Sequence, residues 1–150
     1  MKIHGSVLLD APREKVFAAL YDPGALLTII PGCEDIRQVS PSEYRGQIRL
    51  RLPAVVGVYQ MRVRLVETRA PEASRFEGQV EGPLGRITGS ASFTLAEQGA
   101  QTRMEYAGDG QITGSLARLN TRFTEGLAQS LIDQGLVRLN QKLQEQEMST

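Results

Sequence analysis

The amino-acid sequence predicts an α+β fold in which a curved antiparallel sheet of about seven strands wraps around one long C-terminal helix. Residues 34–112 form successive strand-like segments that turn signals divide. From Ser115 onward the apolar positions repeat every three or four residues, which is the period of a helix with one apolar face. Two short helical segments separate the first strand from the others, and they complete the expected order of elements.

The size and charge of the chain limit the classes of protein to which it can belong. Its 150 residues suffice for a sizeable core, so we expect residues 1–150 to form a single domain. The 17 basic and 17 acidic side chains are interspersed, so the sequence lacks the basic surface that nucleic acid would need. The longest apolar run, Ala25 to Pro31, is far shorter than the roughly 18 residues that span a bilayer, so no transmembrane segment is expected.

The cysteine content and the N-terminal sequence indicate the compartment. Cys33 is the only cysteine, and it cannot form a disulfide within the chain. The chain starts with a strand pattern, and it lacks the charged and apolar regions of an export signal. We therefore expect a reducing, cytoplasmic setting.

The N-terminal segment combines one strand with two short helices. Residues 2–9 follow the two-residue period of a strand. Asp10 stands two residues before Pro12, and this order is typical of a helix start, so we expect Asp10 to cap a helix that ends near Tyr21. A second short helix is expected over residues 25–30, because a Pro-Gly pair follows it.

The rest of the chain divides into a meander of strands and a terminal helix. Turn signals at 40–42, 52–53, 70–72, 82–83 and 98–99 predict short connections, and short connections imply antiparallel strands. The helix is expected to begin near Ser115, with an apolar face of Leu116, Leu119, Phe123, Leu127, Leu131, Ile132, Leu136, Leu139 and Leu143. Gly126 lies inside it, and a solvated helical glycine costs about 1 kcal/mol relative to alanine, so we expect close contact with the sheet there. Residues 145–150 are expected to fray.

The apolar face of the predicted sheet carries small residues where a dense core would need bulk. They are Gly46, Gly78, Gly89, Ala91 and Gly108. They predict an unfilled interior, and thus a pocket of the roughly 300–1,000 Å³ typical of small-ligand sites. The alternative is that the glycines mark bulges and bends of a curved sheet.

Twelve residues of the sheet and helices are expected to line this pocket. They are Leu26, Ile30, Tyr59, Met61, Val63, Phe76, Phe93, Met104, Tyr106, Leu119, Phe123 and Leu127. Within this set, we expect Phe123 and Leu127 of the long helix to face Phe93 and Tyr106 across the pocket. The expected occupant is an apolar small molecule.

The predicted hairpin turn at residues 52–57 is unusually apolar for an exposed tip. It contains Val55 and Val56, and the polar face of its two strands supplies the expected rim of Arg49, Arg51, Arg62 and Arg64. This combination predicts a gate for the pocket, or a docking patch for a partner or a membrane surface. The alternative is a tip that folds onto the protein's own core.

The sequence contains no recognisable catalytic or metal-binding motif. His4 is the only histidine, so the sequence lacks the residues for a metal site with several histidines, and His4 is the only candidate base for a serine triad. Cys33 lacks a neighbouring base in the sequence, which is typical of a structural thiol. We therefore expect no catalytic residue, no metal and no cofactor.

Six segments of the chain follow the pattern of a known family. They are Ala11 to Phe17, Leu20 to Pro23, Ile30 to Glu34, Gly85 to Leu95, Thr102 to Tyr106 and Ile112 to Ala117. The Pro-Gly-Cys-Glu sequence at residues 31–34 is the most specific of these motifs. In them the chain resembles the CoxG-like family of carbon monoxide dehydrogenase subunits, within the START-like (SRPBCC) superfamily. The resemblance implies a helix-grip fold that binds hydrophobic ligands, and an accessory role to a molybdenum hydroxylase of the carbon monoxide dehydrogenase type.

Three hypotheses about function follow. The first is a non-catalytic carrier that takes an apolar molecule, such as a lipid or a quinone, and presents it to a partner enzyme. The second is an enzyme of the same superfamily, similar to polyketide cyclases and dehydratases, and the third is an assembly factor without a ligand. The size of the pocket separates the third hypothesis from the others, and convergent polar groups inside the pocket would favour the second.

Overall fold

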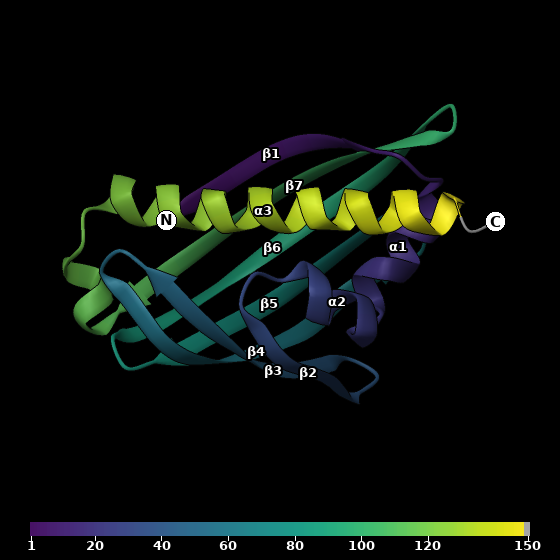
Figure 1. The fold of residues 1–150 in the computed structure, drawn as a ribbon. Helices are drawn as coiled ribbons and strands as arrows, with labels where there is room; N and C mark the ends of the chain where they lie inside the picture. The colour runs from purple at the N-terminus through teal and green to yellow at the C-terminus, as the bar shows by residue number, and fades with distance from the viewer. Residues whose placement is uncertain (149–150) are drawn as a thin grey trace.

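The computed structural model describes residues 1–148 and shows a seven-stranded antiparallel sheet that curves around a C-terminal helix (Figure 1). The strands are β1 (Lys2–Leu9), β2 (Cys33–Ser40), β3 (Glu43–Leu52), β4 (Val55–Arg69), β5 (Ala73–Gly82), β6 (Gly85–Gln98) and β7 (Gln101–Thr113). Their order across the sheet is β1-β7-β6-β5-β4-β3-β2, with every neighbouring pair antiparallel. The predicted α+β architecture and its meander are therefore confirmed.

Two short helices follow β1, as predicted: α1 (Arg13–Tyr21) and α2 (Pro23–Ile29). Asp22 caps α2, because its carboxylate accepts a hydrogen bond from the backbone N–H of Gly24 at 3.2 Å. Both helices lie at one end of the sheet, beside the C-terminal half of the long helix (Figure 1).

The long helix, α3 (Thr121–Met148), begins later and ends later than the sequence predicts. Gly114–Arg118 form a separate 3-10 helix, η1, in which the N–H of Leu116 donates to the carbonyl of Leu84 at 2.8 Å. This contact holds η1 against the β5–β6 turn and delays the start of α3. Residues 145–148 are helical and not frayed, and residues 149 and 150 lie outside the described residues.

Asp10 does not cap α1, so this prediction is wrong. An N-cap residue directly precedes the first helical residue, and Pro12 occupies that position without a side-chain hydrogen bond. The Asp10 carboxylate instead accepts hydrogen bonds from the amides of Gln101 at 2.6 Å, Gln144 at 2.7 Å and Asn140 at 3.0 Å. Asp10 thus joins the end of β1 to the start of β7 and to the C-terminal half of α3.

The core consists of two clusters of buried side chains. The first packs α1, α2 and the C-terminal half of α3 against the sheet, and it contains Leu9, Val16, Phe93, Leu139 and Leu143. The second lies near the start of α3 and contains Ile48, Leu50, Val55, Tyr59 and Leu116. Side chains of the α3 stripe are shared between the two: Leu127 and Leu131 pack on the second cluster, and Leu136 packs on the first.

The close approach of α3 involves Gly135 and not Gly126. Gly126 is exposed, and a Cβ built there meets no atom within 4 Å, so the expected contact with the sheet is wrong. A Cβ at Gly135, which is buried, would lie 3.5 Å from the carbonyl oxygen of Ile29 and 3.7 Å from Cδ of Pro31. The two glycines are nine residues apart, about two and a half helical turns, and therefore lie on opposite sides of α3.

Candidate functional site

Two apolar cavities lie on the concave face of the sheet. The hairpin-end cavity has a volume of about 90 Å³ and is lined by Met1, Leu50, Leu52, Val55, Tyr59, Val80, Ile87, Ile112, Leu116, Thr124, Leu127, Ala128 and Leu131. The glycine cavity has a volume of about 200 Å³, and its concave-face lining includes Met1, Ile3, Met61, Val63, Phe76, Gly78, Val80, Ile87, Gly89, Ala91, Gly108 and Gly110. Met1, Val80 and Ile87 line both cavities, so the two cavities are adjacent.

A row of three glycines opens the glycine cavity. Gly78 of β5 pairs with Gly89 of β6, and Gly89 pairs with Gly110 of β7. The register is regular at this row, so Gly78 and Gly89 do not mark bulges.

A Cβ at Gly89 would collide with the backbone carbonyl of Asp109, so this glycine permits a close approach of β6 and β7, as the alternative of a bent sheet expects. Gly46 lies beside a register shift of β2, which also agrees with that alternative. Around Gly78 there is space for a side chain, because the nearest atom to an added Cβ is the carbonyl oxygen of Arg62 at 3.8 Å.

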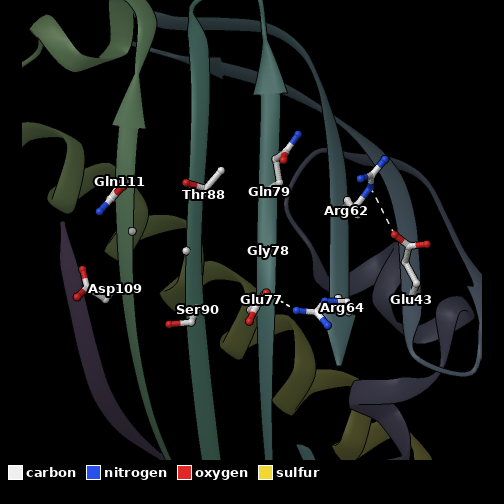
Figure 2. A pocket seen from close by; sticks show the side chains of 12 residues that line it. Glu43, Arg62, Arg64, Glu77, Gly78, Gln79, Thr88, Ser90, Asp109 and Gln111 are labelled. Atoms are coloured by element: carbon white, nitrogen blue, oxygen red, sulfur yellow. Dashed lines mark hydrogen bonds and ion pairs between the residues drawn. The ribbon is translucent and has the colours of Figure 1, made fainter. Parts of the chain in front are cut away.

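The same three glycines also line a polar depression on the outer face of the sheet, about 600 Å³ in volume (Figure 2). Arg62 forms an ion pair with Glu43 at 3.4 Å, and Arg64 forms one with Glu77 at 2.6 Å. All four side chains are partly exposed, and such pairs contribute under ~1 kcal/mol each. These four charged side chains of the outer face therefore form ion pairs. At the glycine row, only the backbone of the sheet separates the outer depression from the glycine cavity.

Tyr59 is the most deeply buried large side chain of the hairpin-end cavity, at 1% exposure. Its hydroxyl has no hydrogen-bond partner among the described residues. Burial raises the pKa of this phenol above its ordinary value. Sequence reasoning selected Tyr59 as a lining residue, but only the packing around it shows that the hydroxyl is unpaired.

Five of the twelve residues expected at the pocket line one of the two cavities. Tyr59 and Leu127 line the hairpin-end cavity, and Met61, Val63 and Phe76 line the glycine cavity. Two further residues, Ile30 and Leu119, pack against the cluster that surrounds the hairpin-end cavity.

The other five residues lie elsewhere. Phe93 and Met104 are buried in the cluster at the α1 end, and Tyr106 packs against it. Leu26 is half-buried on α2 and lines neither cavity, and Phe123 is 38% exposed at the start of α3.

The expected facing of Phe123 and Leu127 toward Phe93 and Tyr106 is therefore wrong. Leu127 packs in the cluster of Tyr59, whereas Phe93 lies in the other cluster, because the start of α3 is at the hairpin end of the sheet. Tyr106 meets α3 further along, where its hydroxyl accepts a hydrogen bond from Gln129 at 2.7 Å.

Several lining residues were not selected from the sequence. They include Met1, Ile3, Leu50, Leu52, Val80, Ile87, Ile112, Leu116, Ala128 and Leu131. Strand alternation places Val80 and Ile87 on the apolar face, so the pattern that found Met61 could also have found them. The pattern names a face of the sheet, and it does not show which part of that face α3 covers tightly.

The tip of the β3–β4 hairpin is divided between the core and the solvent. Leu52 pairs with Val55 around a two-residue turn, Pro53 and Ala54. Val55 is 8% exposed and lines the hairpin-end cavity, which agrees with the alternative of a tip that folds onto the core. Val56 is 62% exposed, as alternation along the strand requires.

Two of the four expected rim arginines flank this tip. Arg51 pairs in register with Val56, and Arg49 lies two residues further along β3 and forms an ion pair with Glu34 at 3.0 Å. Arg62 follows Val55 by seven residues, about 23 Å along an extended strand, and Arg64 lies further still. Arg62 and Arg64 belong to the outer depression (Figure 2) and do not surround the tip, so this part of the prediction is wrong.

The chemistry available elsewhere in residues 1–148 is sparse. Within this part of the chain, no three His, Cys, Asp or Glu side chains gather as a metal ion would require. The Cys33 thiol contacts the carbonyl oxygen of Asp35 at 3.4 Å, and burial raises its pKa, which lowers its reactivity as a nucleophile. No helix of the described chain is both long and apolar enough to cross a bilayer.

The arrangement of the sheet and α3 agrees with what comparison with known proteins finds. Residues 5–144 match the CoxG family of carbon monoxide dehydrogenase subunits. The chain belongs to this family. Among curated proteins, no sequence matches the chain significantly.

Solved structures share the fold of this CoxG chain at low sequence identity. A conserved protein from Geobacillus kaustophilus superposes with a TM-score of 0.93 at 21% identity, covering 97% of this chain and 96% of its own. A START superfamily protein from Mycobacterium smegmatis gives 0.76 at 10% identity, covering 96% and 97%. The di-domain ARO/CYC protein BexL of the BE-7585A biosynthetic pathway gives 0.70 at 14% identity, covering 96% of this chain and 46% of its own.

These similarities show a START-like fold. Together, the CoxG family and this fold support a ligand-binding or accessory domain.

Proposed function

We propose that this CoxG chain is a non-catalytic carrier that holds an apolar molecule, lipid or quinone-like, between the sheet and α3. The pair of adjacent apolar cavities carries the proposal, and Gly78 leaves open space at the centre of the sheet. Family membership supports the second half of the proposal, that the carrier presents its ligand to a molybdenum hydroxylase of the carbon monoxide dehydrogenase type.

Apolar burial alone can supply the affinity of such a carrier. A ligand that hides about 400 Å² of apolar surface gains about 10 kcal/mol at ~25 cal/mol per Å². Association entropy offsets at least about 4 kcal/mol of this gain, and the remaining ~6 kcal/mol corresponds to a dissociation constant of roughly tens of micromolar. Neither cavity alone reaches the roughly 300–1,000 Å³ of a typical small-ligand site, and the two together stay just below it. The ligand would therefore fill both cavities and widen them as it binds.

The hairpin tip is the proposed entrance. Val55 forms part of the wall of the hairpin-end cavity, so a movement of the β3–β4 tip would open this cavity to the outside. Val56 and Phe123 are exposed apolar side chains on the two elements that meet at this end, the hairpin and the start of α3. They would contact the surface, a partner protein or a membrane, from which the ligand enters.

Filling the glycine row tests the proposal. In Gly78→Leu the new side chain would project into the glycine cavity from a position whose Cβ has room, so the fold is expected to persist. The probes are a 1,4-naphthoquinone with a short isoprenoid tail and a lysophospholipid, titrated by NMR, alongside native mass spectrometry of gently purified protein. We expect the wild type to bind one probe and Gly78→Leu to bind it at least about tenfold more weakly.

Gly126→Leu is the matched control, because Gly126 is exposed on α3 and lines neither cavity. Its affinity should equal that of the wild type. Unchanged binding by Gly78→Leu, or the absence of binding of both probes to the wild type, would contradict the carrier function.

A further inference from the structure

The hydroxyl of Tyr59 is a polar group for which the described protein supplies no partner. The cavity contains one other side-chain hydroxyl, that of Thr124, which donates to the carbonyl oxygen of Thr121 at 3.0 Å. The Tyr59 hydroxyl is fully buried and lacks any such bond. A buried hydroxyl that loses its bonds to water without replacement is costly, so this group marks a place where a hydrogen bond remains to be made.

The structure holds the Tyr59 ring in one position. Gly82 of β5 lies directly beside the ring, and a Cβ added at Gly82 would come within 2.7 Å of Cε2 and 2.8 Å of Cγ of Tyr59. Any larger residue at position 82 would therefore displace the ring. Gly82 acts as a positioning residue that lets the Tyr59 ring lie against the backbone of β5.

Building on the proposed carrier function, we infer that the Tyr59 hydroxyl donates a hydrogen bond to a carbonyl oxygen of the bound molecule. The site then selects an apolar molecule that carries such an oxygen over a hydrocarbon of the same shape. Three observations carry this step: the side chain lines the cavity, the hydroxyl has no partner among residues 1–148, and the surrounding lining is apolar. Because the hydroxyl is covered in the ligand-free protein, the lining beside it must move for a ligand oxygen to reach it.

The neutral Tyr59 phenol can donate or accept a hydrogen bond, whereas a carbonyl oxygen can only accept, so in this pairing the hydroxyl is the donor. A phenol is neutral at physiological pH, and burial raises the pKa of Tyr59 further above its ordinary value. A carbonyl-bearing ligand satisfies the hydroxyl, whereas a plain hydrocarbon leaves it unpaired. A site with one such buried polar group distinguishes between ligands by whether they pair with that group, and the apolar area that the ligand buries matters less for this distinction.

A matched pair of probes tests the inference: α-tetralone, which carries one carbonyl, and tetralin, which has a methylene in its place. Both are titrated against the wild type and against Tyr59→Phe, which keeps the ring and removes only the hydroxyl. We expect Tyr59→Phe to bind α-tetralone about tenfold more weakly than the wild type does, and to bind tetralin with unchanged affinity. The melting temperature of the ligand-free variant should not fall, because the lost hydroxyl makes no hydrogen bond in the fold.

The outcomes separate the role of Tyr59 from the carrier function on which it rests. If both probes bind and Tyr59→Phe weakens neither, the cavity binds ligands and the role of the hydroxyl is overturned. If neither probe binds the wild type but the naphthoquinone does, the naphthoquinone replaces α-tetralone, and equal affinity of Tyr59→Phe and the wild type for it overturns the role of the hydroxyl. If the naphthoquinone and the lysophospholipid also fail to bind, the carrier function is overturned together with that role. A fall in the melting temperature of ligand-free Tyr59→Phe would show that the hydroxyl is bonded within the protein, and this result also overturns the inference.

Discussion

Glycine occurs at different positions of this protein for different physical reasons, and the atoms around each position show which reason applies. Gly78 leaves open space in the glycine cavity, whereas Gly82 makes room for the ring of Tyr59. Gly135 lets α3 approach the carbonyl of Ile29, and Gly126 has no neighbour at all within reach of a Cβ. A helical glycine that makes no close contact lowers the stability of its helix, and no improved packing compensates for the loss.

The two α3 glycines should therefore respond differently to substitution. Gly126→Ala should raise the free energy of unfolding by about 1 kcal/mol, because helix propensity improves and nothing is displaced. Gly126→Leu should also be tolerated, whereas Gly135→Leu should destabilise by about 1–3 kcal/mol, because its side chain would push α2 away. Chemical denaturation of the variants measures these differences. A stabilised Gly135→Leu would show that α3 and α2 can separate at no cost.

At the scale of the elements, the β3–β4 hairpin has one residue that packs in the core next to one that is exposed to solvent. Its turn places Ala54 at φ 65°, a left-handed conformation that usually requires glycine, and Leu52 and Val55 pair on either side of it. Because side chains alternate along β4, Val55 points to the cavity and Val56 points to the solvent. One hairpin can thus close the cavity and contact a partner surface with adjacent side chains.

Serine substitutions at the two valines should separate these roles. Val55→Ser removes buried methyl groups and should cost about 1–3 kcal/mol of stability. Val56→Ser should shift stability by less than about 0.5 kcal/mol and should slow the transfer of the naphthoquinone probe from vesicles. Thermal melts and a vesicle transfer assay measure the two effects. Normal transfer by a stable Val56→Ser variant would exclude the tip as the entrance.

At the scale of the whole molecule, the C-terminal half of α3 is packed more completely than its N-terminal half. Its C-terminal half buries Leu139 and Leu143 completely, and Asn140 and Gln144 bind the carboxylate of Asp10. Its N-terminal half covers the hairpin-end cavity, where Leu127 and Leu131 meet empty space as well as side chains. Opening of the fold for a ligand would therefore begin at the N-terminal half of α3, with the Asp10 network as the anchor.

This anchor should depend on pH. Hydrogen bonds from the amide of Gln101, and from those of Gln144 and Asn140, lower the pKa of Asp10 below its ordinary value of 3.8. A lowered pKa in the folded state means that the carboxylate stabilises the fold above the ordinary value, and that this contribution is lost as the pH falls through the lowered pKa. Asp10→Asn should thus melt at a lower temperature than the wild type at neutral pH, and the difference should shrink once the pH falls below 3.8.

Melting curves across this pH range measure the effect, with Glu105→Gln as the control, since Glu105 is exposed on the outer face of β7. The control should follow the wild type at every pH. A constant difference between Asp10→Asn and the wild type from neutral pH into the acid range would mean that the carboxylate charge plays no part in the anchor.

Local patterns in the sequence were sufficient for the element order, because strand alternation, turn residues and helical periodicity act over a few residues. They predicted the meander from β2 to β7, both short helices and the apolar face that contains Tyr59 and Met61. They did not predict that α3 starts at Thr121, because the bond between Leu116 and Leu84 joins residues far apart in the chain.

The sequence by itself determined which side chains can be buried in this protein, since alternation assigns each residue to a face. Only the tertiary structure decided where that burial is complete and where space remains. The glycine row exists because Gly78, Gly89 and Gly110 meet in register on three strands, and Tyr59 is unpaired because no described residue reaches its hydroxyl. Both features depend on the relative placement of elements distant in the chain, which short-range periodicity does not encode.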